Sequence, residues 1–382
     1  MKKLAIIGAS YLQLPLVSKA KEMGIETHCF AWEDGAVCKE TADFFYPVSI
    51  LEKDQILEIC QRVHIDGITT IASDAAVPTV CYVAAKMNLT GNAFDDALIC
   101  TDKYLMRQRF AEFSVSSPKF IIASGNYSVE NFNFPVIVKP TDRSGSRGVK
   151  KIENPEEVKE AVVRAQNESF THQAIIEEYI SGSEVSVESI SWKGKHYILA
   201  ITDKVTTGEP YFVELEHHQP SQLPEQIQQK IKAETLKALS ALKINYGASH
   251  SEFKITPDGK VFAIEVGARM GGDFIGSGLV QLSTGYDFVK GVIDISLGHF
   301  EEPVLMQNKC SGVYFLCKET EYLLPFILKA NKYNQIVNAE ITDNELHKIQ
   351  CSADRSGYFI YKAEKRFVFE TRQPQAPKGD VS

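Results

Sequence analysis

The sequence predicts an α/β and α+β protein: a parallel α/β region at the N-terminus, a middle part of hairpins and helices, and a small C-terminal α+β region. Three observations lead to this prediction. Short apolar runs alternate with amphipathic stretches over the first 100 residues, which is typical of parallel strands joined by helices. Farther along, tight-turn residues separate paired apolar runs, which indicates hairpins. A length of 382 residues leaves room for two or three domains, which we place at 1–100, 101–302 (with a subdomain at about 115–180) and 303–382.

The first 113 residues read as alternating strands and helices. Strands are predicted at 4–10, 26–32 and 66–74. Helices are predicted at 14–24, 52–65, 77–89 and 101–113. Gly24 is suited to end the first helix, and Thr101 or Asp102 is suited to cap the last one.

The rest of the chain reads mainly as hairpins with interspersed helices. Strands are predicted in the hairpin 134–152, at 174–180, in two runs between 184 and 204, and in the hairpin 250–272. Helices are predicted at 154–166, 224–242 and 286–297. Residues 206–224 lack periodicity and predict a loop, and several short strands around another helix follow residue 303.

Composition excludes some classes of function. A net charge of −8 argues against a general nucleic-acid binder, although a local basic pocket remains compatible with it. The eight cysteines show no CxxC pair or zinc-type spacing, so we expect reduced thiols. The initial apolar run ends at Gly8, and no stretch approaches the roughly 18 apolar residues of a membrane span. We therefore expect a cytoplasmic protein without a membrane partner.

Two features near strand ends have two interpretations each. Gly8 is the single glycine where a dinucleotide fingerprint needs three, which argues against a nicotinamide enzyme and favours a packed turn. Ser73 and Asp74 follow the third strand, where they either face a cleft or cap the next helix.

The hairpin 134–152 carries a loop rich in Ser, Gly and Arg. It is not a P-loop, because GxxxxGK[ST] is absent and a strand follows it. The loop is either a solvated tip or a clamp over phosphate, and the roles of Arg143 and Arg147 stay open. Lys139 ends an apolar strand, so its ammonium either reaches the surface or meets an anion.

Glu252 and Glu265 lie on two strands joined by a tight turn, so both carboxylates can share one face of the sheet. Magnesium bound by carboxylates and nucleotide phosphates is the common reason for such a pair. The alternative is a solvated edge with Lys254 as the neutralising partner. Arg269, four residues after Glu265, is either a structural ion-pair partner or a donor to a transferring phosphoryl group or oxyanion.

The stretch EEYISGSE (177–184) can offer backbone hydrogen bonds at the end of a strand to a purine edge, and a carboxylate to ribose hydroxyls. Such stretches are common, however. No GxSxG motif supports a nucleophilic enzyme. His217 and His218, in the predicted loop, either bind metal or belong to a solvated loop.

Taken in order, TDKYLMR, Lys139 with SGSRGV, EEYISGSE, HSEFKI and EVGARMGGD resemble the ATP-grasp superfamily, specifically its carboxylate–amine ligase branch, with L-amino-acid ligases and phosphoribosylglycinamide synthetases. The resemblance covers about residues 1–300. It implies an N-terminal pre-ATP-grasp domain and a two-subdomain ATP-grasp core with a hairpin lid, and a nucleotide held between the two subdomains.

The resemblance also implies roles for individual residues, with ATP and Mg²⁺ (Mn²⁺ as a possible substitute) as cofactors. Glu252 and Glu265 would hold the metal, and Arg269 would stabilise the phosphoryl group or oxyanion. The remaining residues would contact ATP. Lys103 and Lys139 would bind its phosphates, and a loop with Ser144, Gly145, Ser146 and Gly148 would cover them. Ile180, with Glu177 nearby, would contact the adenine, and Glu184 would contact the ribose.

One position departs from the family pattern. The family commonly has Glu-x-Asn-x-Arg with Asn as a further metal ligand, and this chain has Glu265-Val-Gly267-Ala-Arg269. Either one magnesium is held more loosely, through water or phosphate, or a second metal is absent.

The implied reaction joins a small carboxylate, for instance an amino acid, to an amine through an acylphosphate, with release of ADP. The substrates would bind between the N-terminal domain and residues 204–222, where Lys204, Glu214, His217 and His218 lie. Small-molecule substrates are the expected partners, with a homodimer as a possible assembly. The alternatives are a purine-pathway or biotin-carboxylase-like enzyme and a catalytically idle nucleotide-binding module.

Overall fold

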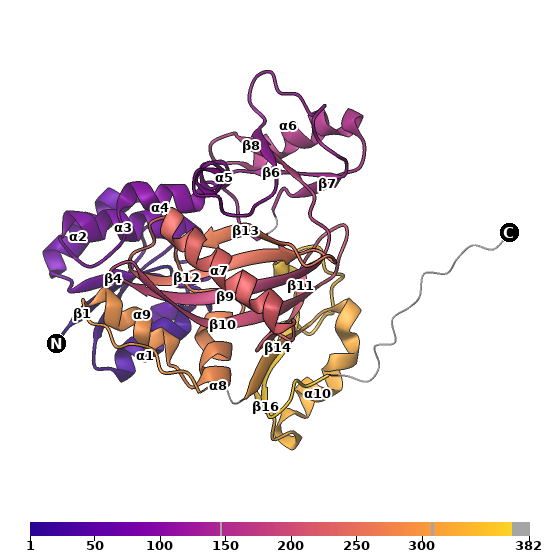
Figure 1. The fold of residues 1–382 in the computed structure, drawn as a ribbon. Helices are drawn as coiled ribbons and strands as arrows, with labels where there is room; N and C mark the ends of the chain where they lie inside the picture. Colours follow the sequence, from indigo (N-terminus) through magenta and orange to yellow (C-terminus); the bar gives the residue numbers. More distant parts are fainter. Residues whose placement is uncertain (146, 307–308, 369–382) are drawn as a thin grey trace.

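A computed structural model describes residues 1–145, 147–306 and 309–368. Within these ranges the strands form three sheets (Figure 1). Their strand orders are β3-β2-β1-β4, β13-β12-β9-β10-β11-β14-β16-β15 and β5-β8-β6-β7. We call them the N-terminal sheet, the central sheet and the small sheet. The mixed α/β and α+β class predicted from the sequence is confirmed.

The N-terminal sheet is parallel throughout, as the alternation of strands and helices predicted. Its strands are β1 (Lys3–Ile7), β2 (Glu26–Phe30), β3 (Phe44–Tyr46) and β4 (Gly67–Thr69). Its helices are α1 (Leu14–Glu22), α2 (Lys53–Val63), α3 (Val77–Lys86) and α4 (Phe94–Thr101). The sequence did not predict β3 and α4, because three and eight residues carry too little periodicity.

The small sheet forms a lobe above the central sheet (Figure 1). Its strands are β5 (Phe120–Ile122), β6 (Val136–Pro140), β7 (Lys150–Ile152) and β8 (Ala174–Glu178). The predicted hairpin is confirmed, since β6 and β7 pair antiparallel from Val136–Ile152 to Val138–Lys150. Helix α6 (Val158–Glu168) packs on β6 and completes a hydrophobic core that belongs to this lobe. Helix α5 (Lys103–Glu112) precedes the lobe, and the Asp102 carboxylate caps it by accepting from Leu105 N (2.8 Å).

The central sheet is antiparallel and holds the strands of the second half of the chain. They are β9 (Ser183–Trp192), β10 (Lys195–Thr206), β11 (Glu214–Gln219), β12 (Gly247–Ile255), β13 (Val261–Gly267), β14 (Cys310–Leu316), β15 (Ile336–Ile341) and β16 (Gly357–Ala363). The C-terminal strands extend this sheet, because β14 pairs with β11. The helices of this part are α7 (Glu225–Ala241), α8 (Val280–Thr284), α9 (Phe288–Ser296) and α10 (Leu324–Leu328).

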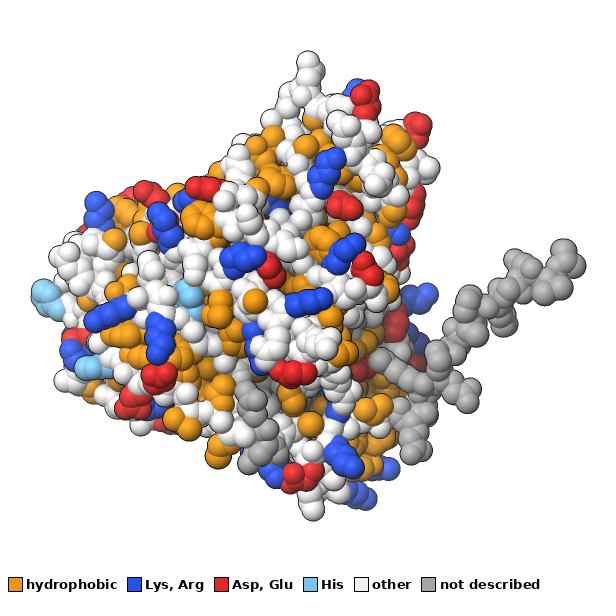
Figure 2. Space-filling model, viewed as in Figure 1, with side chains coloured by type: hydrophobic (Ala, Val, Ile, Leu, Met, Phe, Trp, Pro, Cys, Tyr) orange, Lys and Arg blue, Asp and Glu red, His pale blue; other side chains and the backbone are white. Residues whose placement is uncertain are grey.

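A shared core joins the N-terminal and central sheets. Leu4 and Ile6 of β1, Ile190 of β9 and Phe288 and Val292 of α9 belong to one buried apolar cluster. Each such side chain contributes about 1.5–3 kcal/mol when fully buried, so this contact fixes the two sheets against each other. On the surface, positive and negative side chains are interspersed over the face in Figure 2.

The prediction of a loop over residues 206–224 is wrong in part, because β11 occupies Glu214–Gln219 inside the central sheet. Its sequence, ELEHHQ, offers no apolar alternation, yet five of its six residues are buried. Their polar groups are paired internally: His218 contacts the Glu216 carboxylate (2.9 Å) and Tyr361 Oη (3.0 Å), and Gln219 donates to Thr202 (2.9 Å). A solvated loop at His217 and His218 is therefore excluded.

Among the described residues, no helix combines the length and the apolar character that crossing a bilayer requires.

Candidate functional site

A cavity of about 210 Å³ lies where the small sheet, the central sheet and α5 meet. Most of the residues singled out from the sequence line it: Lys103, Lys139, Ser144, Gly145, Glu177, Ile180, Glu184, Glu252, Glu265 and Arg269. Gly148 is not among the lining residues, and Ser146 lies outside the described residues. Motifs that are far apart in the chain thus converge on one space.

Lys139 ends β6 with its ammonium buried rather than extended to solvent. Its Nζ lies 2.6 Å from Glu177 Oε2, and Arg107 Nε lies 2.8 Å from the other carboxylate oxygen. Burial lowers the pKa of Lys139, and the charge of Arg107 adds to this effect while Glu177 opposes it. Glu177 therefore serves here as the internal counter-ion of two cations.

The sequence reasoning missed Arg107, which is fully buried on α5. Its guanidinium also donates to Ile264 O (2.6 Å) on β13, so it ties α5 to the central sheet. The sequence of α5 gives no signal that this arginine is buried, and its buried partners Glu177 and Ile264 O explain it.

Lys103 is the first residue of α5 and links three parts of the site. Its Nζ donates to Glu265 Oε1 (3.0 Å) and to Arg143 O (2.7 Å), and its backbone N–H donates to Thr141 O (2.8 Å). Burial acts to lower the pKa of Lys103, but Glu265 raises it above the ordinary value, with Asp74 and Glu177 in support. Lys103 is therefore a fixed positive charge at the base of the hairpin loop.

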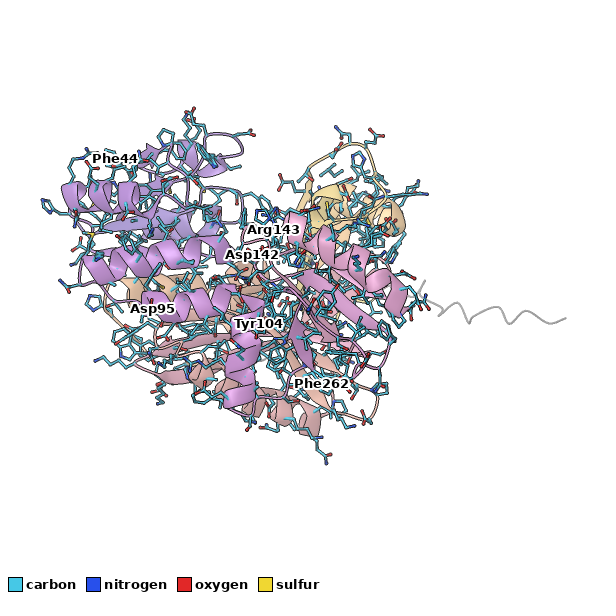
Figure 3. The ribbon with its side chains drawn as sticks, turned by 90° about the horizontal axis from the view of Figure 1, so that it is seen from above. Phe44, Asp95, Tyr104, Asp142, Arg143 and Phe262 are labelled. Atoms are coloured by element: carbon cyan, nitrogen blue, oxygen red, sulfur yellow. The ribbon has the colours of Figure 1, made fainter. Side chains whose placement is uncertain are left out.

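The hairpin loop 141–149 is anchored at its base, and its described residues 144, 145, 147 and 148 are exposed. The Asp142 carboxylate accepts from Ser169 Oγ (3.0 Å) and Thr171 N (2.8 Å), and the Arg143 guanidinium stacks 4.0 Å from the Phe170 ring centroid. Figure 3 shows Asp142 and Arg143 near the middle of the molecule in the view from above. The left-handed φ angles of Gly145 (+67°) and Gly148 (+71°) need glycine. Arg147 is exposed, whereas Arg143 lines the cavity.

Glu252 and Glu265 are direct cross-strand partners of β12 and β13, but they contact different cations. Glu265 pairs with Lys103, whereas Glu252 lies 2.7 Å from Lys204 Nζ. Burial acts to raise the pKa of Glu252, but Lys204 and His250 together hold it well below the ordinary range. Glu252 is therefore ionised in its half-buried position.

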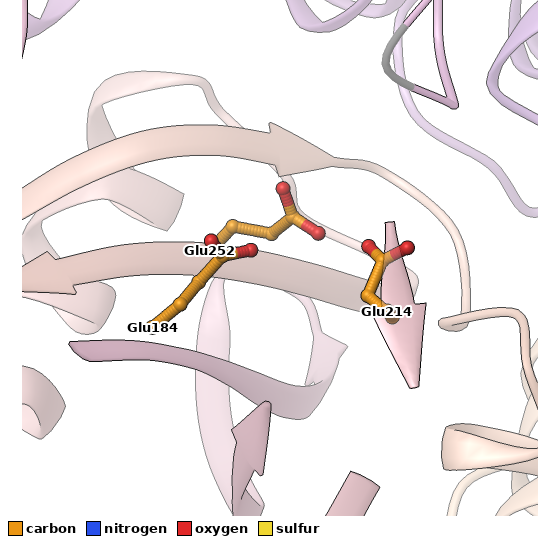
Figure 4. Close-up of side chains that lie close together, drawn as sticks. All are labelled: Glu184, Glu214 and Glu252. Atoms are coloured by element: carbon orange, nitrogen blue, oxygen red, sulfur yellow. The ribbon is translucent and has the colours of Figure 1, made fainter. Parts of the chain in front are cut away.

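Glu184, Glu214 and Glu252 form an acidic cluster (Figure 4), and Lys204 contacts all three members. Its Nζ lies 3.0, 3.2 and 2.7 Å from these three carboxylates, and its side chain is only 2% exposed. Because the carboxylates converge on one point, the ammonium supplies the charge that a bound metal ion would supply there.

His250 is a second cation that the sequence reasoning missed. It lies between Glu188, which contacts Nδ1, and Glu252, 3.2 Å from Nε2. Burial acts to lower the pKa of His250, but the two glutamates raise it to about 9. Glu188 is fully buried and also accepts from Gly271 N (3.0 Å). Alternation along β9 and β12 places these polar residues on one face, which is the signal that could have found them.

Asp74 faces the cavity rather than capping the next helix. Its carboxylate accepts from Arg269 Nε (2.9 Å) and NH2 (2.6 Å), and the helix that follows has no side-chain cap at Ser73. Burial acts to raise the pKa of Asp74, but Arg269 lowers it. Of the two interpretations of Asp74, the structure supports the cleft, which is where ligands bind at the carboxyl ends of parallel strands.

The donor set of this cavity fits a magnesium–nucleotide complex. Lys103 and Lys139 offer two buried ammonium groups for phosphate oxygens, and Glu252 and Glu265 offer carboxylates on adjacent strands of the same cavity. Magnesium is usually held by one or two carboxylates together with substrate phosphates. These four residues are the ones that would hold ATP phosphates and Mg²⁺.

Comparison with known proteins finds a family match over the part of the chain that carries most of these residues. Residues 132–277 match the family model of the ATP-grasp domain. Alanine–anticapsin ligase of Bacillus subtilis (strain 168) is 26% identical over an alignment 272 residues long, and the match covers 61% of this chain and 57% of that protein. A D-alanine–D-alanine ligase of Christiangramia forsetii is 30% identical over 151 residues, 37% of this chain and 44% of that one. The chain thus spans somewhat more than half the length of the alanine–anticapsin ligase.

Solved structures extend the likeness to nearly the whole chain. L-amino acid ligase from Bacillus licheniformis superposes with a TM-score of 0.80 at 22% identity, covering 96% of this chain and 94% of that one. Phosphoribosylglycinamide synthetase from Anaerococcus prevotii gives 0.76 at 24% identity, covering 95% and 94%. The order of motifs and the match of residues 132–277 to the ATP-grasp domain model agree, and the solved structures show the same fold over nearly the whole chain.

Proposed function

We propose that the protein is an ATP- and Mg²⁺-dependent ligase that joins a small carboxylate to an amine and releases ADP. The names of similar proteins support this reaction class, since alanine–anticapsin ligase, D-alanine–D-alanine ligase and L-amino acid ligase are all among them. An amino acid is the carboxylate that these names favour. Residues 101–302 would form the ATP-grasp core, with the small sheet as its lid.

The single observation that carries the proposal is the contact of Lys103 Nζ with Glu265 Oε1 at 3.0 Å. It puts a phosphate-binding type of cation and a metal-binding type of carboxylate side by side in one cavity, with Lys139 and Arg269 on the same walls. Phosphoryl transfer depends mainly on positioning and on neutralising charge, and this donor set provides both.

Each residue then has a defined role. Lys103 and Lys139 bind phosphate oxygens, and Glu252 and Glu265 hold Mg²⁺, which neutralises charge on the phosphates when bound. Arg269 donates to the negative charge that develops on the phosphoryl group or the oxyanion. The tip of loop 141–149 covers the phosphates and excludes water from the acylphosphate. Glu184 and the segment around Ile180 contact the ribose and the adenine.

The decisive experiment measures ADP and phosphate release from ATP and Mg²⁺ with pooled amino acids. We expect release that depends on the amino acids and on Mg²⁺, and that stops when EDTA removes the metal. Glu265→Gln should reduce the rate at least about a hundredfold, because it removes a metal-binding charge. Glu58→Gln, at an exposed position of α2, is the matched control and should keep the wild-type rate.

Two other outcomes would replace this proposal. ADP release that requires bicarbonate instead of an amine indicates a carboxylase-like enzyme, a class found among the structural neighbours. Tight nucleotide binding without turnover indicates a binding module. If Glu265→Gln turns over ATP like the wild type, the metal site is assigned wrongly.

A further inference from the structure

Strand β13 carries a gap in its row of cavity-facing side chains. Glu265 and Gly267 are two residues apart and therefore share a face, and both line the cavity together with Arg269. A Cβ atom on Gly267 would lie 2.6 Å from Asp74 Oδ1 and 3.2 Å from Arg269 Cζ. The space that a side chain at position 267 would need is thus filled by the Asp74 carboxylate.

Asp74 reaches this gap from another part of the protein. It follows β4 of the N-terminal sheet, 195 residues before Arg269 in the chain. A backbone hydrogen bond close to this ion pair also joins the two segments, because Ala72 N donates to Met270 O (3.0 Å). The ion pair is mostly buried, with 16% of the Asp74 side chain and 13% of the Arg269 side chain exposed.

The contact is bidentate, which fixes a planar guanidinium in direction as well as in distance. Nε and NH2 of Arg269 donate to the two carboxylate oxygens at 2.9 and 2.6 Å. NH1 makes a longer contact of 3.3 Å with Met270 O. Since one edge of the guanidinium is held by Asp74, the orientation of its other donors in the cavity depends on Asp74.

We propose that Asp74 is a positioning residue for Arg269 and that Gly267 is glycine because a side chain there would displace Asp74. The N-terminal sheet thereby contributes directly to the geometry of the site in the central sheet. The kinetic part of this proposal rests on the proposed ligase function. The structural part, the orientation of Arg269, does not.

The first test is a double-mutant cycle on ADP release. Asp74→Ala should lower kcat about tenfold or more and leave KM for ATP within about twofold, because a charged hydrogen-bond partner is lost while the phosphate contacts of Lys103 and Lys139 remain. Asp74→Asn keeps the shape and should lose less. In an Arg269→Ala background, Asp74→Ala should have no further effect. An equal loss in both backgrounds would overturn the proposal.

The second test uses the gap itself. Gly267→Ala should lower kcat as Asp74→Ala does. The double variant Asp74→Ala/Gly267→Ala should be no worse than Asp74→Ala alone, since the closest contact of the new Cβ, 2.6 Å to Asp74 Oδ1, is then gone and the 3.2 Å contact with Arg269 involves a side chain that can shift. Gly278→Ala is the matched control, because its Cβ would meet only Phe274 Cβ at 3.8 Å, an ordinary contact. Wild-type kinetics for Gly267→Ala would overturn the role of the glycine.

A third readout needs no turnover. In protein labelled with [¹⁵N]arginine, the Arg269 Nε–H resonance, assigned with Arg269→Lys, should shift and exchange faster with solvent in both Asp74→Ala and Asp74→Asn. An unchanged resonance in both folded variants would overturn the proposal. If the wild type turns over no substrate while this resonance responds, the proposed function fails and the positioning by Asp74 stands.

Discussion

Lys103 and Glu265 are 162 residues apart in the chain, and their side chains meet at 3.0 Å between α5 and β13. Around this contact lie two further buried ion-pair groups, Lys139 with Glu177 and Lys204 with Glu252. In each group a lysine is held by carboxylates inside the cavity wall. The cavity wall is therefore organised as paired charges, and a ligand that binds these groups must exchange partners with them.

Replacing Lys139 with Met should weaken binding of a non-hydrolysable ATP analogue about tenfold or more, because it removes a buried ammonium from the cavity. The fold should persist, since Glu177 keeps Arg107 as a counter-ion at 2.8 Å. Isothermal titration calorimetry measures the affinity. Lys159→Met, at an exposed position of α6, is the control and should bind like the wild type. Equal affinities for the two variants would exclude Lys139 as a phosphate contact.

Replacing Lys204 with Met should destabilise the protein by about 3 kcal/mol, because three carboxylates then converge without their central cation. Mg²⁺ or Mn²⁺ should raise the Tm of this variant more than that of the wild type, since a metal ion can take the place of the ammonium. Lys254→Met removes a cation that touches only one member of the cluster, Glu184 (2.9 Å). It should therefore show a smaller loss of stability and no metal-dependent gain. If neither Mg²⁺ nor Mn²⁺ raises the Tm of Lys204→Met more than that of the wild type, this account is wrong.

The sequence predicted the elements that carry a local periodicity or a turn signal, and the residues that it singled out on such elements line one cavity. The parallel start of the chain, the hairpin with Lys139 and the hairpin with Glu252 and Glu265 are examples. It failed where buried polar groups replace apolar ones. Strand β11 reads as a loop because it has no apolar alternation, and the partners that allow His218 and Gln219 to be buried, Tyr361 and Thr202, lie elsewhere in the chain.

The sequence also could not predict which residues the site residues contact. Nothing local indicates that Asp74 meets Arg269 or that His250 meets Glu188, because each contact joins segments that are far apart in the chain. Alternation gives the face on which a residue lies, but the register between strands decides which residue it touches.

The pair formed by Asp273 and Arg355 predicts a dependence of stability on pH. Arg355 NH1 donates to Asp273 Oδ2 at 2.8 Å, and His217 lies 3.5 Å from the same oxygen. Burial acts to raise the pKa of Asp273, but Arg355 lowers it well below the ordinary value, with His217 in support. A group whose folded pKa is lowered adds stability above its unfolded pKa, near 3.9, and that stability is lost as the pH falls through the folded value.

Asp273→Asn should therefore be less stable than the wild type by about 2 kcal/mol at pH 7, and the difference should shrink as the pH falls below about 4. Asn also tolerates the left-handed backbone at this position (φ +51°), so the substitution tests charge rather than backbone strain. Urea unfolding at a series of pH values measures the difference. Asp34→Asn, at an exposed site, should show no such trend. A gap that stays constant from pH 7 to pH 3 would mean that the Asp273 charge contributes nothing.

Gly182 connects the small sheet to the central sheet, between Ile180 and Glu184 of the cavity wall, and its replacement tests how closely two backbone segments pass. A Cβ at this position, where φ is +149°, would lie 1.9 Å from the backbone oxygen of Ile255 on β12. Because a backbone atom cannot move aside cheaply, Gly182→Ala should cost about 3 kcal/mol or more of unfolding free energy. Gly125→Ala shares a left-handed φ (+58°) but meets nothing within 4 Å, so it should cost only about 1 kcal/mol. Chemical denaturation compares the two variants, and similar losses would show that backbone strain alone, without the contact to Ile255, requires glycine at position 182.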